Sequence, residues 1–249
     1  MKIAGIQLRT LSRAETMTTL AGLLRAGQGS HVVTINPEMV VHATQDTLYK
    51  TILHSADVHV VDGVGVQLVA RLQGFKIDRF TGVDLVDKLS GLAKEEDARV
   101  FFLGTGDSVV LMQAAKNLQK RYPGLKIAGT HPGIRLVEKP YGVIPDNETE
   151  HQAMLARIRE TNPAVVFVAF GHGKQEKWIW QYKKMLPDAR IFVGVGGALD
   201  FIAGRVRRAP VWMQKAGLEW LWRLFCQPWR LSRVFNATAV FLWKVMRGR

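Results

Sequence analysis

The sequence predicts an α/β fold: a Rossmann-like parallel sheet with helices on both faces, plus a basic helical appendage at the C-terminal end. Two observations predict the sheet. Short apolar runs alternate with stretches of helical length, and most runs are apolar at every position, as in parallel strands that helices cover on both faces. A third observation, a change of composition near Gly204, predicts the appendage.

Six apolar runs have the length and the β-branched content of strands. They are His31–Ile35, Val58–Val61, Val100–Leu103, Lys126–Gly129, Ala164–Ala169 and Ile191–Val195. Between them we expect helices over Pro37–Ser55, Gly82–Glu95, Ser108–Tyr122, Glu148–Thr161 and Gln175–Leu186. Residues 130–147 depart from this alternation with three prolines and two glycines, and we expect a long loop there. Such a loop is either a binding loop or lid, or a disordered surface loop.

The length of 249 residues suits one α/β domain with an appendage. We place the boundary at Gly204, with a catalytic domain over residues 1–204 and an appendage over residues 205–249. The single cysteine, Cys226, excludes an intrachain disulfide and favours a reducing compartment. The sequence shows no secretory signal and no run of about 18 apolar residues, so we expect a cytoplasmic protein, soluble or peripheral on the membrane.

Positive charge is concentrated in the predicted appendage. The net charge is +13, and residues 205–249 hold ten basic residues against one acid, Glu219, and five of the seven tryptophans. Tryptophan beside arginine suits an anionic membrane surface, where indole lies at headgroup depth and guanidinium meets lipid phosphate. Nucleic acid is the rival partner. We favour the membrane because Leu218, Leu221 and Trp222 belong to apolar faces. A third interpretation of residues 205–249 is a solvated helical hairpin that packs on the core.

The residues that follow the predicted strands are the candidate ligand-binding residues, because ligands of open α/β sheets bind outside the carboxyl ends of the strands. Most of these segments are glycine-bearing turns before helices, where backbone N–H groups bind phosphate well. The segments are Thr34–Pro37, Asp62–Gly65, Gly104–Gly106, Gly171–Glu176 and Gly194–Gly197. They indicate a nucleotide or nucleotide-sugar ligand, although each glycine is equally consistent with a tight turn that binds nothing.

Asp62 is the candidate with the clearest chemistry. It follows the run Val58–Val61 and precedes Gly63. At the mouth of a pocket, desolvation raises the pKa of a carboxylate from about 3.9 toward a value that suits a general base. A carboxylate that caps the next helix is an equally good interpretation of this position.

The sequence predicts neither a metal site nor another cofactor. It contains no Asp-x-Asp pair to hold Mg²⁺ on a diphosphate, and its seven histidines lack the spacing of a metal site. Cationic side chains would then stabilise a leaving diphosphate, with Arg79, Lys174 and the appendage arginines as candidates. The dinucleotide fingerprint is incomplete, because Val109 stands where a small residue is expected. An NAD-dependent oxidoreductase and a nucleic-acid-binding protein remain the alternatives.

Segments along nearly the whole chain resemble the WecG/TagA/CpsF glycosyltransferases, in the same order. They are Thr34–Glu38, Val61–Gly65, Arg79–Asp84, Phe102–Gly104, Gly171–Glu176, Gly194–Gly197, Arg207–Pro210 and Gly217–Leu224, followed by Pro228 and Arg230. The resemblance implies inverting, metal-independent transfer of N-acetylmannosamine from its UDP-linked form. The implied acceptor is N-acetylglucosamine on undecaprenyl diphosphate, at the cytoplasmic face of the membrane. This reaction makes the linkage unit of wall teichoic acid, and another branch of the family transfers the uronic acid form.

The resemblance also implies roles for individual residues. Asp62 matches the general base that deprotonates the acceptor hydroxyl. The matched binding residues are Thr34, Asn36, Arg79, Gly104, Gly171, Lys174, Gln175 and Gly196 in the pocket motifs, and Arg223, Arg230 and Arg233 as diphosphate-binding residues of the appendage. One position departs from the family pattern, since Gly173 stands where proline is usual. Self-association into a homo-oligomer stays open.

Overall fold

The computed structural model describes residues 1–9, 11–228 and 231–247, and of residues 232, 233 and 236 only the backbone. Within these residues, six parallel strands form the central sheet in the order β4-β3-β10-β9-β5-β6. Their bounds are β3 (Ser30–Ile35), β4 (Val58–Val61), β5 (Arg99–Gly104), β6 (Lys126–His131), β9 (Val165–Ala169) and β10 (Ile191–Gly194). Each lies within two residues of a predicted run, which confirms the predicted sheet.

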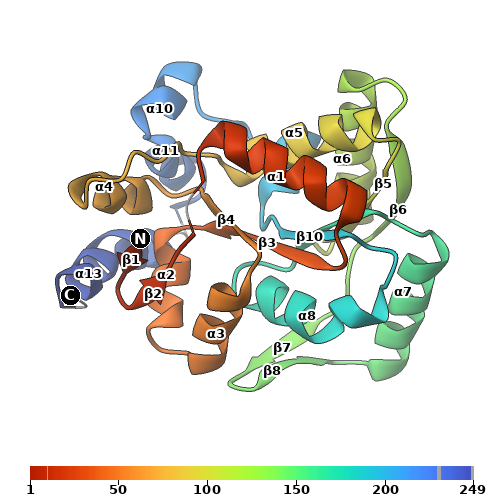
Figure 1. Ribbon diagram of the computed structural model, residues 1–249, viewed down its shortest axis with the longest axis horizontal. Coiled ribbons are helices and arrows are strands. Elements are labelled where there is room, and N and C mark those ends of the chain that lie inside the picture. The colour runs from red at the N-terminus through yellow and green to blue at the C-terminus, as the bar shows by residue number, and fades with distance from the viewer. Residues whose placement is uncertain (10, 229–230, 248–249) are drawn as a thin grey trace.

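Helices cover both faces of the sheet, as predicted (Figure 1). One face carries α1 (Arg13–Ala26), α5 (Gly82–Glu95), α6 (Ser108–Arg121) and α9 (Ala198–Ala203). Toward the other face lie α2 (Pro37–Ala43), α3 (Thr47–Ser55), α4 (Val64–Leu72), α7 (Glu148–Glu160), α8 (Lys174–Tyr182) and the 3₁₀ turn η1 (Lys183–Met185). Val32 and Val33 show why the strands are apolar throughout: both are fully buried, but in hydrophobic clusters on opposite faces.

The predicted helix over Pro37–Ser55 is two helices in the structure. Helix α2 ends at Ala43, and the Asp46 side chain then accepts a hydrogen bond from the Tyr49 amide, so that Asp46 caps a new helix, α3. An aspartate at this position satisfies a backbone donor that the first turn leaves unpaired. The prediction of one continuous helix is therefore wrong, because the cap signal outweighs the apolar periodicity.

The prediction of a long loop over residues 130–147 is also largely wrong, because most of these residues form strands. Strand β6 extends to His131, and β7 (Leu136–Lys139) pairs antiparallel with β8 (Gly142–Pro145). Leu136 and Val143 are buried in the cluster that includes α7 and α8, which holds the hairpin on the domain. The prolines and glycines lie at the strand ends and in the turn, where they are compatible with a hairpin.

The chain begins with a short hairpin, β1 (Lys2–Ile3) and β2 (Ile6–Gln7), and ends in the helical appendage. The appendage contains α10 (Val211–Ala216), α11 (Glu219–Cys226), α12 (Leu231–Phe235), the π-helix η3 (Asn236–Val240) and α13 (Phe241–Arg247). Figure 1 shows α10, α11 and α13 at the same side of the molecule as α4. Phe241 of α13 is fully buried in the hydrophobic cluster that also contains residues of α2 and α4. Among the described helices, none is long and apolar enough to cross a membrane.

Candidate active site

A cleft of about 740 Å³ lies at the carboxyl ends of β3, β4 and β10, and residues of the appendage form part of its wall. A smaller cavity of about 520 Å³ adjoins it at the ends of β5 and β9. The two share Thr105, Gly171, Gly196, Gly197 and Asp200. Both cavities therefore lie at the edge of the sheet where the sequence predicts ligand binding.

Asp62 lies in the cleft directly after β4, with its backbone N–H bonded to the carbonyl of Ile35 at 2.9 Å. It does not cap the next helix: the N-cap of α4 is Gly63, and this cap makes no side-chain hydrogen bond. The carboxylate instead accepts from the Gly82 amide. Burial raises the pKa of Asp62 to about 6, against the opposing effects of the Gly82 N–H and of the Arg79 guanidinium.

Thr34 and Asn36 also line the cleft, and local hydrogen bonds hold both side chains. The buried Thr34 Oγ1 donates to the carbonyl of Gly194 at 3.0 Å, across two neighbouring strands. The Asn36 Oδ1 accepts from the Met39 amide at 3.0 Å and caps α2. The wall beside Asp62 is thus polar and preorganised.

Gln175 connects the start of α8 to the end of β10. Its Oε1 accepts from the Gly196 amide at 2.9 Å, and its Nε2 donates to Glu176 Oε1 at 2.6 Å. Glu176 is fully buried, and its Oε2 accepts from the Gly173 amide at 2.7 Å and from the Tyr49 hydroxyl at 3.3 Å. Burial raises the pKa of Glu176 to about 7. The sequence interpretation assigned no role to Glu176, which holds the Gln175 amide in one orientation.

Gly173, the departure from the family pattern, has a conformation that proline cannot adopt. Its φ is +86°, whereas the proline ring holds φ near −65°. A Cβ atom here would lie 2.8 Å from Glu138 Oε1 and from His42 Cε1, so a side chain would force these two residues to shift. Glycine therefore lets the turn before α8 approach the β7–β8 hairpin closely.

The predicted glycines divide into two groups. Gly171 and Gly196 line both cavities, and a Cβ at either would meet open space. Gly104 lies outside both linings: its φ is +112°, and a Cβ there would lie 2.7 Å from the carbonyl carbon of Ala169 on β9. Lys174, the first residue of α8, also lies outside both linings.

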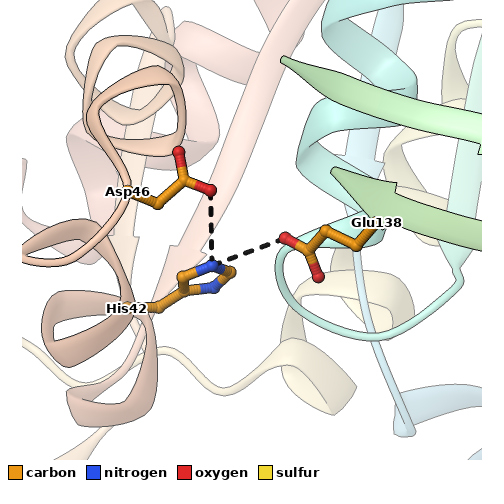
Figure 2. Close-up of side chains that lie close together, drawn as sticks. All are labelled: His42, Asp46 and Glu138. Carbon is orange, nitrogen blue, oxygen red and sulfur yellow. Dashed lines mark ion pairs between the residues drawn. The ribbon is translucent and has the colours of Figure 1, made fainter. Parts of the chain in front are cut away.

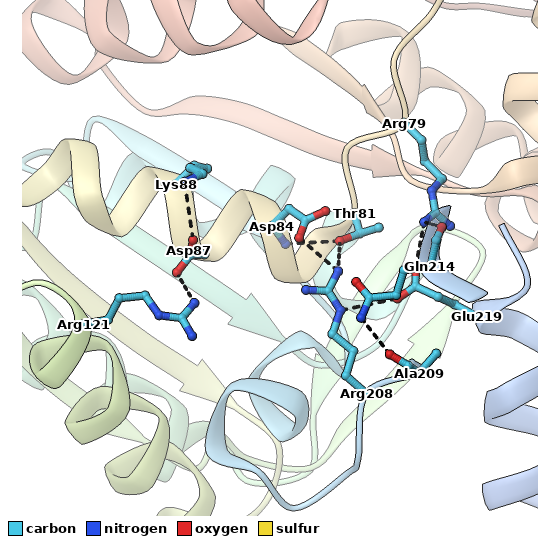
Figure 3. A network of polar contacts seen from close by, with 10 residues as sticks. All are labelled: Arg79, Thr81, Asp84, Asp87, Lys88, Arg121, Arg208, Ala209, Gln214 and Glu219. Carbon is cyan, nitrogen blue, oxygen red and sulfur yellow. Dashed lines mark hydrogen bonds and ion pairs between the residues drawn. The ribbon is translucent and has the colours of Figure 1, made fainter. Parts of the chain in front are cut away.

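Arg79 belongs to an ion-pair network that attaches the appendage to the domain (Figure 3). Its Nη2 lies 2.8 Å from Glu219 Oε2 and donates to the carbonyl of Gln214 at 2.8 Å. Arg208 extends the network: its Nη2 donates to Asp84 Oδ1 at 2.9 Å, and its Nε donates to Glu219 Oε1 at 3.4 Å. Sequence interpretation missed this network, although Glu219, the lone acid among ten bases, was a signal for it.

Arg223 is the predicted appendage arginine that the structure places in the cleft. Its Cζ lies 4.8 Å from the centre of the Phe201 ring, and its Nη2 is 3.3 Å from where a Cβ on Gly197 would lie. Its positive charge lowers the pKa values of Asp62 and Asp200 against the dominant effect of burial. Arg230 lies outside the described residues, and Arg233 is described only by its backbone in α12.

Among the described residues, His42, Asp46 and Glu138 form a cluster whose ligand atoms are close enough to hold a metal ion (Figure 2). The Lys177 ammonium already fills this position, 2.6 Å from Asp46 Oδ2 and 2.9 Å from Glu138 Oε1. The Lys177 side chain is only 1% exposed, so its charge is held among these carboxylates. The cluster is therefore a structural ion-pair network that ties α2 and α8 to the β7–β8 hairpin.

Comparison with known proteins supplies a family and named relatives. The model of the glycosyl transferase WecG/TagA/CpsF family matches residues 1–249. A Bacillus subtilis (strain 168) protein is 33% identical over 210 residues, which are 84% of this chain and 76% of that protein. Its name is N-acetylglucosaminyldiphosphoundecaprenol N-acetyl-beta-D-mannosaminyltransferase. Proteins of the same name from Bacillus spizizenii and Staphylococcus aureus (strain NCTC 8325 / PS 47) are 33% and 31% identical, over 86% and 88% of this chain and 77% and 80% of their own.

Proposed function

The chain belongs to the WecG/TagA/CpsF family of glycosyl transferases, and we propose that it transfers N-acetylmannosamine from UDP-N-acetylmannosamine to N-acetylglucosamine on undecaprenyl diphosphate. The names of the relatives support this sugar and this acceptor. The product would serve the linkage unit of wall teichoic acid or a related cell-surface polymer. The observation that carries the proposal is the carboxylate of Asp62, which lies in the cleft at the strand ends with its pKa raised to about 6 by burial.

In this proposal Asp62 is the general base. Its carboxylate accepts the proton of the acceptor hydroxyl while the hydroxyl oxygen bonds to the anomeric carbon of the donor sugar. The bond from that carbon to the UDP oxygen breaks on the opposite side, which inverts the configuration and leaves UDP with the electron pair. A base whose pKa lies just below neutral is ionised at the working pH and still holds the proton well enough to assist the transfer.

Arg223 and backbone N–H groups stabilise the leaving diphosphate in the proposed mechanism. Preorganised cations and N–H groups in a water-poor site stabilise developing negative charge, which is the task a metal ion performs in other enzymes. Arg223 lies beside Gly197, the N-cap residue of α9, in the glycine turn that follows β10. The proposal therefore assigns no metal ion to the reaction.

The smaller cavity suits the donor nucleotide. Gly106, Gly171 and Gly196 border it. No atom lies within 4 Å of where a Cβ on any of them would be, so a diphosphate can approach their backbone closely. Asp200 lies where the two cavities join, and a carboxylate there suits the hydroxyl groups of a ribose. We assign the cleft beside Asp62 to the acceptor sugar.

An anionic membrane surface is the partner that we propose for the appendage, residues 205–249. Trp212, Phe225 and Phe235 expose large apolar side chains there, among basic residues. Because the acceptor is lipid-linked, the enzyme would work peripherally at the inner face of the membrane. We keep the boundary at Gly204 as a proposal, and we assign no nucleic-acid partner.

The decisive experiment is transfer from UDP-N-acetylmannosamine to a short-chain lipid diphosphate carrying N-acetylglucosamine, read by mass spectrometry with and without EDTA. We expect the disaccharide product in both samples. Folded protein that fails with several UDP-sugars, in the presence of membranes, would disprove the function, and loss of the product with EDTA would disprove the metal-independent mechanism. Titration with NAD and an oligonucleotide tests the alternatives, and we expect binding of UDP alone.

A further inference from the structure

The outward face of α4 is unusually apolar for an exposed helix. Leu68 and Leu72, one turn apart, are 52% and 80% exposed, and Phe75 after the helix is 41% exposed. The inward face is ordinary, with Val66, Val69 and Ala70 buried. A helix that is apolar on its solvent side as well as its core side indicates a second apolar partner.

The turn that ends α4 presents Phe75 beside the last helical turn. Gly74 has a φ of +85°, and its N–H bonds to the carbonyl of Arg71 at 2.9 Å. The Phe75 N–H bonds back to the carbonyl of Ala70 at 3.0 Å. This is the Schellman geometry of a glycine-terminated helix, and it holds the backbone of Phe75 against the end of α4.

Basic residues flank this turn, and the turn itself contains no acidic residue. Arg71 and Lys76 flank the exposed Leu72 and Phe75, and no acidic residue occurs from Gly63 to Ile77. Large apolar side chains between basic residues match an anionic lipid surface, where the apolar groups enter the acyl boundary and the cations meet headgroup phosphate.

Helix α4 continues the surface that the appendage forms. At its start, a Cβ on Gly217 of the appendage would lie 2.8 Å from Val64 Cγ2, and the ring of Phe241 lies 3.4 Å from a Cβ position on Gly65. Leu68 lines the cleft together with the exposed Trp220 and Leu242 of the appendage. The apolar face of α4 therefore begins at the rim of the cleft and extends away from it.

We propose that the outward face of α4 and the turn after it, residues 68–76, form a membrane contact of the catalytic domain itself. Leu72 and Phe75 enter an anionic lipid surface, and Arg71 and Lys76 contact its phosphates. The contact would hold the cleft mouth, at Leu68, against the bilayer from the side of the domain, next to the appendage. The inference rests on the proposed function only for the statement that the acceptor comes from that bilayer.

The test is sedimentation of the full chain, without substrate, with vesicles of phosphatidylglycerol and phosphatidylcholine. The variant Leu72→Gln/Phe75→Gln removes the apolar contact, and we expect about tenfold weaker binding, because burial of apolar area supplies the attraction. The matched control is Val109→Gln/Met112→Gln, which changes two exposed apolar residues of α6, far from α4 in Figure 1. We expect the control to bind as the unmodified chain does. A third variant, Arg71→Gln/Lys76→Gln, should bind several-fold less to anionic vesicles and unchanged to vesicles of phosphatidylcholine alone.

Equal binding of the Leu72/Phe75 variant and the unmodified chain would overturn the proposal, as would an equal loss in the α6 control. Thermal unfolding checks that all variants fold. Transfer to a water-soluble short-chain acceptor should be unchanged in the Leu72/Phe75 variant, because neither residue touches the reacting groups. If the unmodified chain transfers no sugar at all, the proposed function fails while the vesicle result still decides the membrane contact.

Discussion

At the scale of single residues, Asp62 combines two conditions that seldom occur together. It borders a cleft that a substrate can enter, yet burial dominates its electrostatics and raises its pKa to about 6. The neighbouring groups act in opposite directions, since Arg79 and Arg223 favour the ionised form and Glu219 disfavours it. The appendage therefore influences the proposed base through Glu219 and Arg223.

Replacement of Asp62 by asparagine should remove the base while keeping the shape of the site. We expect turnover to fall by about 10²–10⁴-fold, the usual contribution of general-base catalysis, with UDP binding retained. Steady-state kinetics and UDP titration measure the two quantities. Asp87→Asn is the control, because Asp87 lies on α5 outside the cleft, where it pairs with Lys88 and with Arg121 of α6 (Figure 3). Near-normal turnover of Asp62→Asn would remove Asp62 as the base.

The pH dependence of the reaction should report the ionisation of Asp62. A general base works in its ionised form, so activity is lost as pH falls through the pKa of about 6 and is constant above it. We expect kcat/KM to fall about tenfold per pH unit below that value. A profile that stays flat down to pH 4.5 would show that an ordinary, exposed carboxylate or another group is the base.

At the scale of elements, glycines decide how closely the strand ends and turns approach one another. Gly104 at the end of β5 has a left-handed φ of +112° and lies against the backbone of Ala169. Gly173 makes the corresponding approach between the turn before α8 and the β7–β8 hairpin. These contacts set the shape of the cavity walls without contributing a side chain.

Alanine at position 104 should destabilise the fold more than alanine at another left-handed glycine. Gly104→Ala adds backbone strain and an overlap with Ala169, and we expect a loss of about 2–5 kcal/mol in the free energy of unfolding. Gly124 also has a positive φ, +91°, but a Cβ there would meet no atom closer than 3.9 Å. Gly124→Ala should therefore lose only about 1 kcal/mol. Urea unfolding compares the two, and equal losses would contradict the overlap.

We expect the Arg79–Glu219 ion pair to contribute to the attachment of α11 to the domain. Both side chains are largely buried, so the pair is screened less than a surface pair. A double-mutant cycle with Arg79→Gln and Glu219→Gln should give a coupling free energy of about 1–3 kcal/mol. The exposed pair Lys126–Asp97, measured in the same way, should give less than about 1 kcal/mol. A coupling of Arg79 with Glu219 no larger than that of the exposed pair would show that other contacts hold α11.

At the scale of the whole molecule, the appendage and the domain share a core and a cleft. Phe241 is fully buried among residues of the N-terminal half, and Arg223 lines the cleft beside Asp62. Under the proposed function, one surface then carries the appendage, α4 and the cleft mouth. Membrane contact and catalysis would in this way occur at the same side of the molecule.

Deletion of the residues after Gly204 should reduce vesicle binding and transfer together. It removes Arg223 from the cleft and uncovers the site of Phe241, whose loss alone costs about 3–5 kcal/mol of stability. Thermal unfolding and UDP binding establish that the shortened chain is folded. A folded, fully active truncation would show that the appendage serves only to tether the enzyme.

The sequence alone determined the fold class, the six strands of the sheet and the position of Asp62 at a strand end. These depend on local patterns: apolar runs, helical spacing and the residue after each run. Helix caps are local too. The cap residue Asp46 was visible within Pro37–Ser55, but the prediction of one helix gave more weight to the apolar pattern.

Only the tertiary structure decided which distant residues meet. Three contacts show this. Arg79 pairs with Glu219, and Phe241 packs among residues of the N-terminal half, each across more than a hundred positions. Lys177 pairs with Asp46 across more than a hundred positions and with Glu138 across several tens. Residues 130–147 form a hairpin because Leu136 and Val143 find a core to pack against, which their own segment cannot supply. The physical reason is that packing selects among conformations that local preferences leave nearly equal in free energy.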